Sequence, residues 1–171
     1  CFGWSQLIGA ELLDLAPLGV IGYHPAMLPR NRGRHPLIWA LVLGMKQTGS
    51  TFFFMDEGAD SGDILSQEAI DIAPDDDAGD LYQNMTNTAL AQISDFLPHL
   101  QKGTYQRLPQ DHGLANNWRK RSAADGRIDW RMQTASIHNL VRALARPYPG
   151  ATFTHEGRDI VVWKSRPETS A

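Results

Sequence analysis

One stretch of the sequence gathers side chains that could transfer a proton and bind an anion. It holds His24, followed by Arg30, Arg32 and Arg34. A neutral histidine can accept or donate a proton near neutral pH, and arginine guanidinium groups bind carboxylates and phosphates through paired hydrogen bonds. These residue types favour a site where an anionic ligand meets a proton-transferring group. The alternative is a polar loop whose histidine and arginines face solvent.

The elements on either side of this stretch would hold it in place. The apolar run Leu18 to Ile21 lies between two prolines and predicts a buried strand, with His24 at its carboxyl end. Ligands of open α/β sheets bind at the carboxyl ends of strands. Two prolines and a glycine stiffen the loop, and Pro36 predicts the start of a helix over residues 37–43. We therefore expect a rigid ligand-binding loop.

A carboxylate that could pair with the histidine follows the next predicted strand. The run Ser50 to Met55 predicts a strand covered on both faces, and Asp60 lies after it in a turn between two glycines. A nearby carboxylate stabilises a protonated imidazole and fixes its orientation. From this turn Asp60 could meet His24. Asp63 of the same turn is the second candidate, because it could equally cap the turn.

Three blocks of the sequence resemble the folate-dependent formyltransferases, which use 10-formyltetrahydrofolate. The first reads His-Pro-x-x-Leu-Pro-x-x-Arg-Gly-x-x-Pro over 24–36, and the second reads Met-Asp-Glu-Gly-Ala-Asp-Ser-Gly-Asp-Ile over 55–64. The third, formed by 126–130, 137–143 and 147–151, is similar to the start of the family's C-terminal region. The resemblance implies formyl transfer to an amine, which requires removal of a proton and stabilisation of an oxyanion.

By this resemblance His24 is the general base or acid, and Asp60 is its carboxylate partner. The family's third catalytic residue, an asparagine two positions before the histidine, is Gly22 here. Strand alternation places residue 22 on the same face as His24, so Tyr23 on the opposite face cannot supply the missing carboxamide. Loss of one oxyanion donor can slow an enzyme ~10²–10³-fold. A water, a backbone amide or Asn31 could compensate.

The resemblance also marks positions that would contact the folate co-substrate. They are the segment Gln6, Leu7 and Ile8, the arginine Arg34, and the loop residues Asp56, Glu57, Gly58, Ala59 and Asp60. Leu7 and Ile8 could equally belong to the apolar face of a helix, and Arg30 and Arg32 could face solvent. No metal is implied. The acidic run Asp75 to Asp77 predicts a helix start, with a metal-binding cluster as the alternative.

Composition narrows the class of protein. The 171 residues carry a formal net charge of −3 and 42% hydrophobic residues, which suits a globular domain and argues against a general nucleic-acid binder. The single cysteine excludes an intrachain disulfide and fits a reducing compartment. No apolar run approaches the ~20 residues of a membrane span, and no signal peptide is visible. We therefore expect a cytoplasmic protein.

The expected fold class is α/β: the carboxyl half of a Rossmann-like, doubly wound formyltransferase domain, followed by a small C-terminal region with a β-hairpin. We place the catalytic domain at 1–110 and a linker with the C-terminal region at 111–171, the polar residues 110–127 being a surface connection. Only one buried strand precedes the histidine loop, whereas each βαβ unit takes ~30 residues, so the N-terminal part of the catalytic domain is expected to be missing. The further predicted elements are a helix over 4–16, a helix that starts at the signal 74–77 and runs to about Lys102, a helix over 134–145, a strand over 64–72 and a hairpin around Glu156 and Gly157. The long helix has a predicted core stripe of Leu81, Met85, Ala89, Ile93, Leu97 and Leu100.

The expected function is N-formylation of a primary amine, with 10-formyltetrahydrofolate as co-substrate and an amino sugar of a nucleotide sugar as acceptor. The run Arg-Gly-Arg-His-Pro-Leu-Ile-Trp over 32–39 is similar to the sugar formyltransferases. The alternatives are a methionyl-tRNA formyltransferase, a formyltetrahydrofolate hydrolase, and a catalytically inert remnant that binds folate. A homodimer is compatible with the sequence. We expect no membrane partner. A nucleic-acid partner is expected only if the protein is a methionyl-tRNA formyltransferase.

Overall fold

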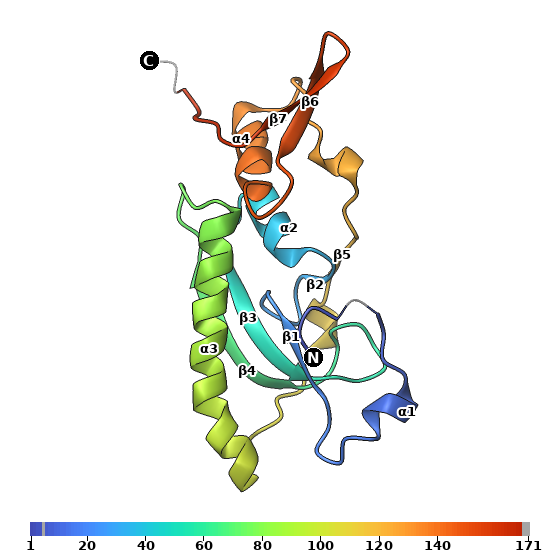
Figure 1. The fold of residues 1–171 in the computed structure, drawn as a ribbon. Helices are drawn as coiled ribbons and strands as arrows, with labels where there is room; N and C mark the ends of the chain where they lie inside the picture. Colours follow the sequence, from blue (N-terminus) through green and yellow to red (C-terminus); the bar gives the residue numbers. More distant parts are fainter. Residues whose placement is uncertain (5, 169–171) are drawn as a thin grey trace.

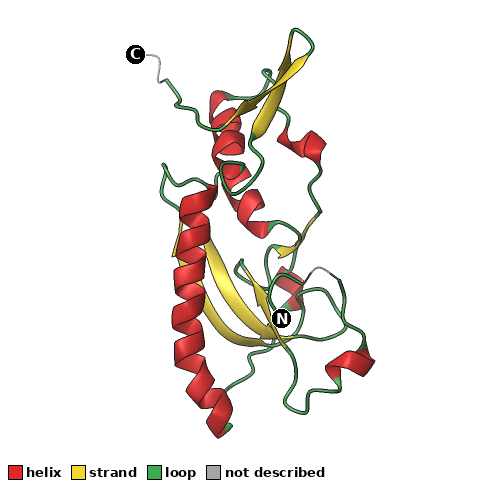
Figure 2. Cartoon of the chain, viewed as in Figure 1, coloured by secondary structure: helices red, strands yellow, loops and turns green. Residues whose placement is uncertain are grey.

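A computed structural model describes residues 1–4 and 6–168, and it has a mixed α/β fold (Figure 1 and Figure 2). The elements are, in chain order, α1 (Ala10–Leu13), β1 (Ile21–His24), β2 (Arg32–Gly33), α2 (Pro36–Val42), β3 (Gln47–Phe54), β4 (Ile64–Asp71), α3 (Ala78–Lys102), β5 (Asn117–Trp118), α4 (Thr134–Ala143), β6 (Ala151–His155) and β7 (Arg158–Val162), with 3-10 turns at His112–Leu114 and Ala123–Gly126. The predicted α/β class and the C-terminal hairpin are both confirmed.

The main sheet carries the histidine strand at one side. Its strands lie in the order β1–β3–β4, and both neighbouring pairs are antiparallel, with His24 opposite Thr51. Along the other edge of β1, Cys1 lies as a parallel neighbour would. Its amino group donates to the carbonyl of Ile21, and its carbonyl accepts from the N–H of Tyr23. Both described strand pairs of this sheet are thus antiparallel, and the two hydrogen bonds of Cys1 attach the N-terminal segment to the remaining edge of β1.

The long helix α3 covers one face of this sheet (Figure 1). It begins after the N-cap Asp77, whose carboxylate accepts from two backbone N–H groups, and it ends at Gly103 in the left-handed conformation. The ring of Phe52 from β3 packs edge-on against Phe96, with 4.9 Å between centroids. The predicted range and helix start are confirmed. Leu97 of the predicted stripe is 46% exposed, so the buried face is turned toward Phe96 instead.

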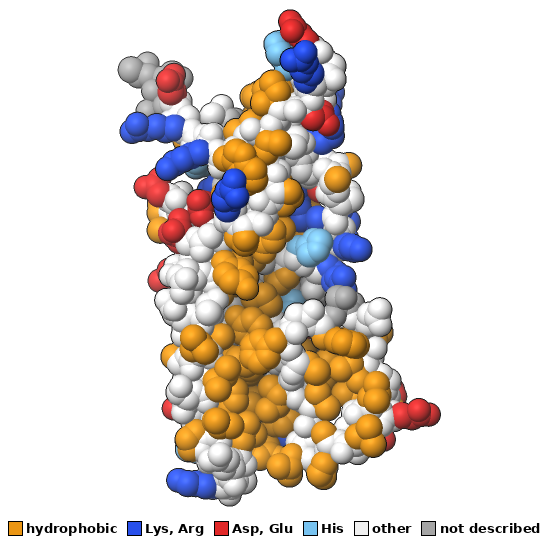
Figure 3. All heavy atoms as spheres, viewed as in Figure 1, with side chains coloured by type: hydrophobic (Ala, Val, Ile, Leu, Met, Phe, Trp, Pro, Cys, Tyr) orange, Lys and Arg blue, Asp and Glu red, His pale blue; other side chains and the backbone are white. Residues whose placement is uncertain are grey.

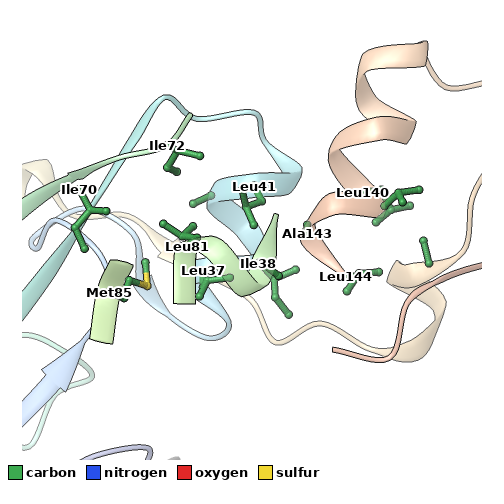
Figure 4. Close-up of a cluster of buried hydrophobic side chains, with 14 of the residues drawn as sticks. Leu37, Ile38, Leu41, Ile70, Ile72, Leu81, Met85, Leu140, Ala143 and Leu144 are labelled. Carbon is green, nitrogen blue, oxygen red and sulfur yellow. The ribbon is translucent and has the colours of Figure 1, made fainter. Parts of the chain in front are cut away.

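The largest hydrophobic core joins α2, α3 and α4 (Figure 4). Its side chains also come from β4, and those labelled in the figure are Leu37, Ile38, Leu41, Ile70, Ile72, Leu81, Met85, Leu140, Ala143 and Leu144. Burial of one such leucine or isoleucine stabilises the fold by ~1.5–3 kcal/mol. Because α2 starts directly after the histidine loop, this core also fixes the far end of that loop.

The helix predicted over 4–16 is wrong in extent. Among the described residues of this range only α1 is helical, and none of its side chains is buried. Gly9 is its N-cap, and glycine's low helical propensity disfavours continuation of the helix across that point. Leu7, Leu12 and Leu15 are each 60% exposed or more. Their spacing therefore does not reflect packing on the sheet.

The strand predicted over 18–21 lies further along the chain. β1 begins at Ile21 and contains His24 itself, whereas Leu18 is 65% exposed. Backbone pairing with β3 sets these bounds, and the apolar run only overlaps them. The prediction that the following strand is covered on both faces is confirmed, since every residue of β3 after Gln47 is buried.

The segment 108–118, called the covering segment below, returns to the sheet after α3. Leu108 pairs with Ile64 at the start of β4 through two backbone hydrogen bonds of 2.8 and 2.9 Å. Ten residues later β5 pairs with β2 in parallel. Gln110 between them is 6% exposed. The prediction that residues 110–127 form a surface connection is therefore wrong for Gln110, whereas residues 111–120 are exposed or partly buried, as predicted.

Two features are absent from the described residues 1–4 and 6–168. No helix in them is both long enough and apolar enough to cross a membrane. No three side chains of the metal-ligating types are grouped in them. In the acidic run before α3, Asp77 caps the helix and Asp76 accepts the backbone N–H of Ala73 at 2.8 Å.

Asp77→Ala is expected to lower the free energy of unfolding by about 0.5–2 kcal/mol, because it removes the side chain that caps α3. Urea unfolding followed by far-UV circular dichroism measures the loss. Asp95→Ala, an exposed acid inside the same helix, is the matched control and should change stability by less than ~0.5 kcal/mol. Equal losses in the two variants would contradict the capping role.

Candidate active site

His24 is the last residue of β1, and the loop that follows holds its ring. The residue is 4% exposed, and its Nε2 lies 2.7 Å from the backbone carbonyl oxygen of Asn31. A carbonyl oxygen can only accept, so Nε2 carries the hydrogen and the neutral ring presents its lone pair at Nδ1. Asn31 has a left-handed φ of 62°, and its N–H donates to the side-chain oxygen of Asn116 at 2.8 Å. The tautomer of His24 is therefore set by the backbone.

The carboxylate of Asp60 faces the other ring nitrogen. Its Oδ2 lies 3.5 Å from His24 Nδ1 and accepts the N–H of Gly33 at 2.8 Å. The side chain is 21% exposed, so water reaches the carboxylate only in part. When Nδ1 takes up a proton, the charged ring has a carboxylate at one nitrogen and a carbonyl at the other. The arrangement can therefore hold a proton that arrives at Nδ1.

Backbone contacts shape the turn that carries Asp60. A Cβ at Gly62 would lie 1.8 Å from the carbonyl oxygen of Phe54, so only glycine fits there. The second candidate, Asp63, uses its backbone carbonyl to accept the N–H of Phe54 at 2.8 Å. Of the two carboxylates weighed from the sequence, the structure brings Asp60 to His24.

A cavity of about 780 Å³ opens beside this pair. His24, Asp60 and Arg34 border it, together with Tyr82 from α3 and Tyr148. The volume lies within the ~300–1,000 Å³ of small-molecule sites. Figure 3 shows a band of hydrophobic side chains on the face beside α3, with histidine and basic side chains next to it. The cavity thus combines apolar walls with a few ionisable groups.

A second cavity of about 550 Å³ lies behind the Asp60 turn. Val20 and Met55 contribute apolar lining, and Asp56, Glu57 and Arg107 contribute charge. The predicted folate loop therefore borders both cavities. Asp56 and Glu57 line the smaller cavity, and Asp60 lines the larger one.

The remaining predicted folate positions lie outside both linings. Gly58 and Ala59 are exposed at the tip of the loop. In the N-terminal segment, Gln6 and Leu7 are exposed and Ile8 is partly buried, and none of the three borders either cavity. The structure does not bring this segment to the His24–Asp60 pair, and its contact with folate stays a prediction.

The three arginines of the histidine loop have different surroundings. Arg30 is exposed, and Arg34 borders the larger cavity. Arg32 is 7% exposed, and its Nη2 donates to Gln110 Oε1 at 2.6 Å. The alternative that Arg32 faces solvent is therefore wrong, because the covering segment lies over it.

Positive charge surrounds His35 at the mouth of the larger cavity. Burial, together with the charges of Arg34, Arg121 and Lys120, holds the pKa of His35 below its ordinary value of 6.5. His35 is therefore neutral at pH 7. The Arg121 guanidinium lies 4.7 Å from the ring centroid of Trp39, which holds it in place. This side of the cavity suits an anionic ligand.

Several residues of the site were not predicted from the sequence, because they belong to no recognisable motif. Gln110, Asn116 and Trp118 come from the covering segment, and Tyr82 and Tyr148 come from α3 and the loop after α4. The Asn31 to Asn116 hydrogen bond joins positions 85 residues apart. The periodicity of apolar residues within a segment carries no information on contacts between segments so far apart. From the sequence alone, the polar residues of the covering segment therefore predict only a surface position.

Comparison with known proteins decides the family. A model of the formyl transferase family matches residues 1–96, and a model of the formyl transferase C-terminal domain matches residues 120–171. This chain belongs to the formyl transferase family. Methionyl-tRNA formyltransferase of Solibacter usitatus is 38% identical over 169 residues, which are 99% of this chain and 54% of that protein. The chain thus spans about half the length of this curated relative.

Solved structures share the fold of this formyl transferase chain. A 4-N formyltransferase from Francisella tularensis is 21% identical and superposes with a TM-score of 0.84, covering 98% of this chain and 70% of that one. An N-formyltransferase from Helicobacter canadensis, in complex with folinic acid and dTDP-3-aminofucose, is 21% identical with a TM-score of 0.70, covering 81% and 51%. The family resemblance seen in the sequence is confirmed.

The ring of Phe53 occupies the space into which a side chain at position 22 would project. Gly22 lies opposite Phe53, and a Cβ at Gly22 would be 2.9 Å from the Phe53 ring and 3.0 Å from Met55 Cγ. Gly22 and His24 are both buried, on alternate positions of β1 that share one face, as strand alternation predicts. A larger residue at this position would therefore require the Phe53 ring or the Met55 side chain to shift.

Gly22→Asn alone is expected to destabilise the protein by about 1–3 kcal/mol, because the new side chain overfills the space beside Phe53. The double variant Gly22→Asn/Phe53→Ala should lose less stability than the sum of the losses in Gly22→Asn and Phe53→Ala, since truncation of the buried ring leaves room for the new side chain. Thermal unfolding measures both. Gly9→Asn is the control, because nothing lies within 4 Å of a Cβ there. A Gly22→Asn variant as stable as the parent would contradict the packing account.

Proposed function

We propose that this chain carries the reacting centre of an N-formyltransferase. The observation that supports this best is the pair of the buried His24 and the partly buried Asp60 at the border of a ligand-sized cavity, in a chain of the formyl transferase family. The co-substrate is 10-formyltetrahydrofolate, which supplies the activated formyl group. The acceptor is a primary amine.

His24 acts as the general base in this proposal. An amine that attacks a formyl carbon must lose a proton, and Nδ1 is the ring nitrogen whose lone pair is available. Asp60 offsets the charge of the imidazolium, and the Asn31 carbonyl keeps the ring from turning. The same ring can return the proton to the leaving nitrogen. With Gly22 in place of a carboxamide, transfer should be slower than in a relative that has one.

The two cavities offer neighbouring places for the co-substrate and the acceptor. A reduced pterin presents N–H and amino donors, and the smaller cavity offers the acceptor groups of Asp56 and Glu57 beside the apolar Val20 and Met55. The loop that carries Asp60 contributes Asp56 and Glu57 to the smaller cavity and Asp60 to the larger one. We therefore assign the pterin to the smaller cavity and the acceptor amine to the larger one, which His24 borders.

The acceptor that we propose is an amino sugar of a nucleotide sugar. The positive charge of Arg34, Lys120 and Arg121 near the larger cavity suits a diphosphate. Tyr82 and Tyr148 at its border provide rings on which a base could stack. The Helicobacter canadensis neighbour was solved with dTDP-3-aminofucose and folinic acid, which is the same pair of ligand classes.

Methionyl-tRNA is the second candidate acceptor, because a methionyl-tRNA formyltransferase is 38% identical to this chain. The remaining alternatives are hydrolysis of formyltetrahydrofolate and folate binding without turnover. Incubation of the full-length protein with 10-formyltetrahydrofolate and each acceptor in turn separates all four. Formyl-amino-sugar, formyl-methionyl-tRNA, formate or unchanged co-substrate would be the respective product.

His24→Ala and Asp60→Asn are each expected to lower kcat at least ~10²-fold, because the first removes the base and the second its partner. Mass spectrometry of the formylated product follows the rate. Asp63→Asn is the matched control, since this acid lies in the same turn without contacting His24, and its kcat should stay within about three-fold of the parent. If Asp63→Asn lowers kcat more than Asp60→Asn does, the assignment of Asp60 as the partner of His24 is wrong.

Arg34→Ala is expected to raise KM for the nucleotide amino sugar ~10-fold or more, because one charge-assisted contact to a phosphate contributes about 1.5–3 kcal/mol. The kcat should change little. Arg30→Ala removes an exposed arginine of the same loop that borders neither cavity, and it should leave KM unchanged. An equal rise of KM in the two variants would show that substrate binding depends only on the overall positive charge of the loop and not on Arg34 itself.

A further inference from the structure

Gln110 holds the turn that carries the site's carboxylate, and the reaction described above makes no use of it. It is 6% exposed. The antiparallel bridge between Leu108 and Ile64, continued in register, places Gln110 opposite Gly62. Its Nε2 donates to the carbonyl of Gly62 at 2.6 Å and to the carbonyl of Asp60 at 3.0 Å. One side-chain amide thus fixes two carbonyl groups of this turn.

The oxygen of the same amide reaches the histidine loop. Gln110 Oε1 accepts from Arg32 Nη2 at 2.6 Å, and that Nη2 also lies 3.1 Å from His112 Nδ1. The next residue after Arg32 is Gly33, whose N–H donates to Asp60 Oδ2 at 2.8 Å. The contacts close a ring that runs from the Asp60 carboxylate through β2 and Gln110 back to the Asp60 backbone. The two loops are therefore locked to each other on both sides of the carboxylate.

Asp60 depends on such support because of its backbone. Its φ is 54°, in the left-handed region that residues other than glycine adopt in ordered structures mainly where the surroundings hold them. Its Oδ2 is 3.5 Å from His24 Nδ1, at the long end of hydrogen-bonding range. A small rotation of the turn would therefore separate the pair.

An amide is the one side-chain group that meets all of these demands. A carboxylate at position 110 would still accept from Arg32, but it would repel the carbonyls of Asp60 and Gly62. An ammonium group would donate to the carbonyls and repel Arg32. We propose that Gln110 is a positioning residue for formyl transfer, which keeps the Asp60 carboxylate aimed at His24. The proposal rests on the proposed function of that pair.

The variants that test this are Gln110→Met, which keeps the length of the side chain without its polar atoms, and Gln110→Glu, which keeps only the contact to Arg32. Both are expected to lower kcat ~10–100-fold, because a catalytic group displaced by about 1 Å can cost ~10²-fold. KM for both substrates should change by less than about two-fold. Gln83→Met on the exposed face of α3 is the matched control and should behave as the parent.

A double-mutant cycle with Asp60→Asn separates positioning from general support of the fold. If Gln110 acts through the carboxylate, Gln110→Met added to Asp60→Asn should cause almost no further loss of kcat. A full additional loss in the double variant would show a merely structural role and overturn the proposal. Parent-like kcat in both Gln110 single variants would overturn it as well. Should Gln110→Met fail to fold, the same cycle is run with Gln110→Glu.

Hydrogen–deuterium exchange tests the ring of contacts independently of activity. In Gln110→Met the amide of Gly33 and the peptides over 58–62 should exchange faster, while α3 keeps its protection. Unchanged exchange at these positions would overturn the proposal even if the activity falls. If the parent protein transfers no formyl group at all, the proposed function fails, and faster exchange would still establish the contacts of Gln110 with the turn.

Discussion

The carboxylate of Asp60 is the point on which the candidate site depends. One of its oxygens faces His24 Nδ1 at 3.5 Å and accepts the Gly33 N–H at 2.8 Å. Three separate pieces of chain meet there: the end of β1, the loop before α2 and the turn before β4. Each is attached to a rigid element, namely the main sheet or the core of α2, α3 and α4. The hydrophobic core and the sheet therefore fix the positions of the three segments that form the candidate site.

The parts of this arrangement that local sequence determines were predictable. Pro36 starts a helix because its φ suits the first turn, and Asp77 caps α3 because its carboxylate satisfies free N–H groups. The proximity of Asp60 to His24 followed from the family resemblance, together with the position of each residue at or after the end of a predicted strand. In each case the relevant atoms lie within a few residues or at the end of a predicted strand.

The parts that depend on distant partners were not predictable. Apolar spacing before Pro17 indicated a packed helix, but spacing cannot say whether another surface covers the leucines, and here most of them are exposed. Gln110 looked like part of a polar linker, because its burial is created by partners 48 to 78 residues away. The fit of the Phe53 ring beside Gly22 likewise depends on the register of two strands, which no single segment specifies.

The covering segment has a consequence for recombining this chain with its relatives. It follows α3 in sequence, and both family models leave residues 97–119 unmatched, yet its contacts belong to the histidine loop. A Cβ at Gly33 would lie 2.4 Å from the carbonyl of Trp118, so the two backbones must be matched to each other. A chimera joined after residue 110, the predicted domain boundary, would combine loops and cover from different parents. A junction placed beyond Trp118 would instead inherit the loop and its cover as one unit, and the new C-terminal region would then have to match the core that α4 forms with α2 and α3.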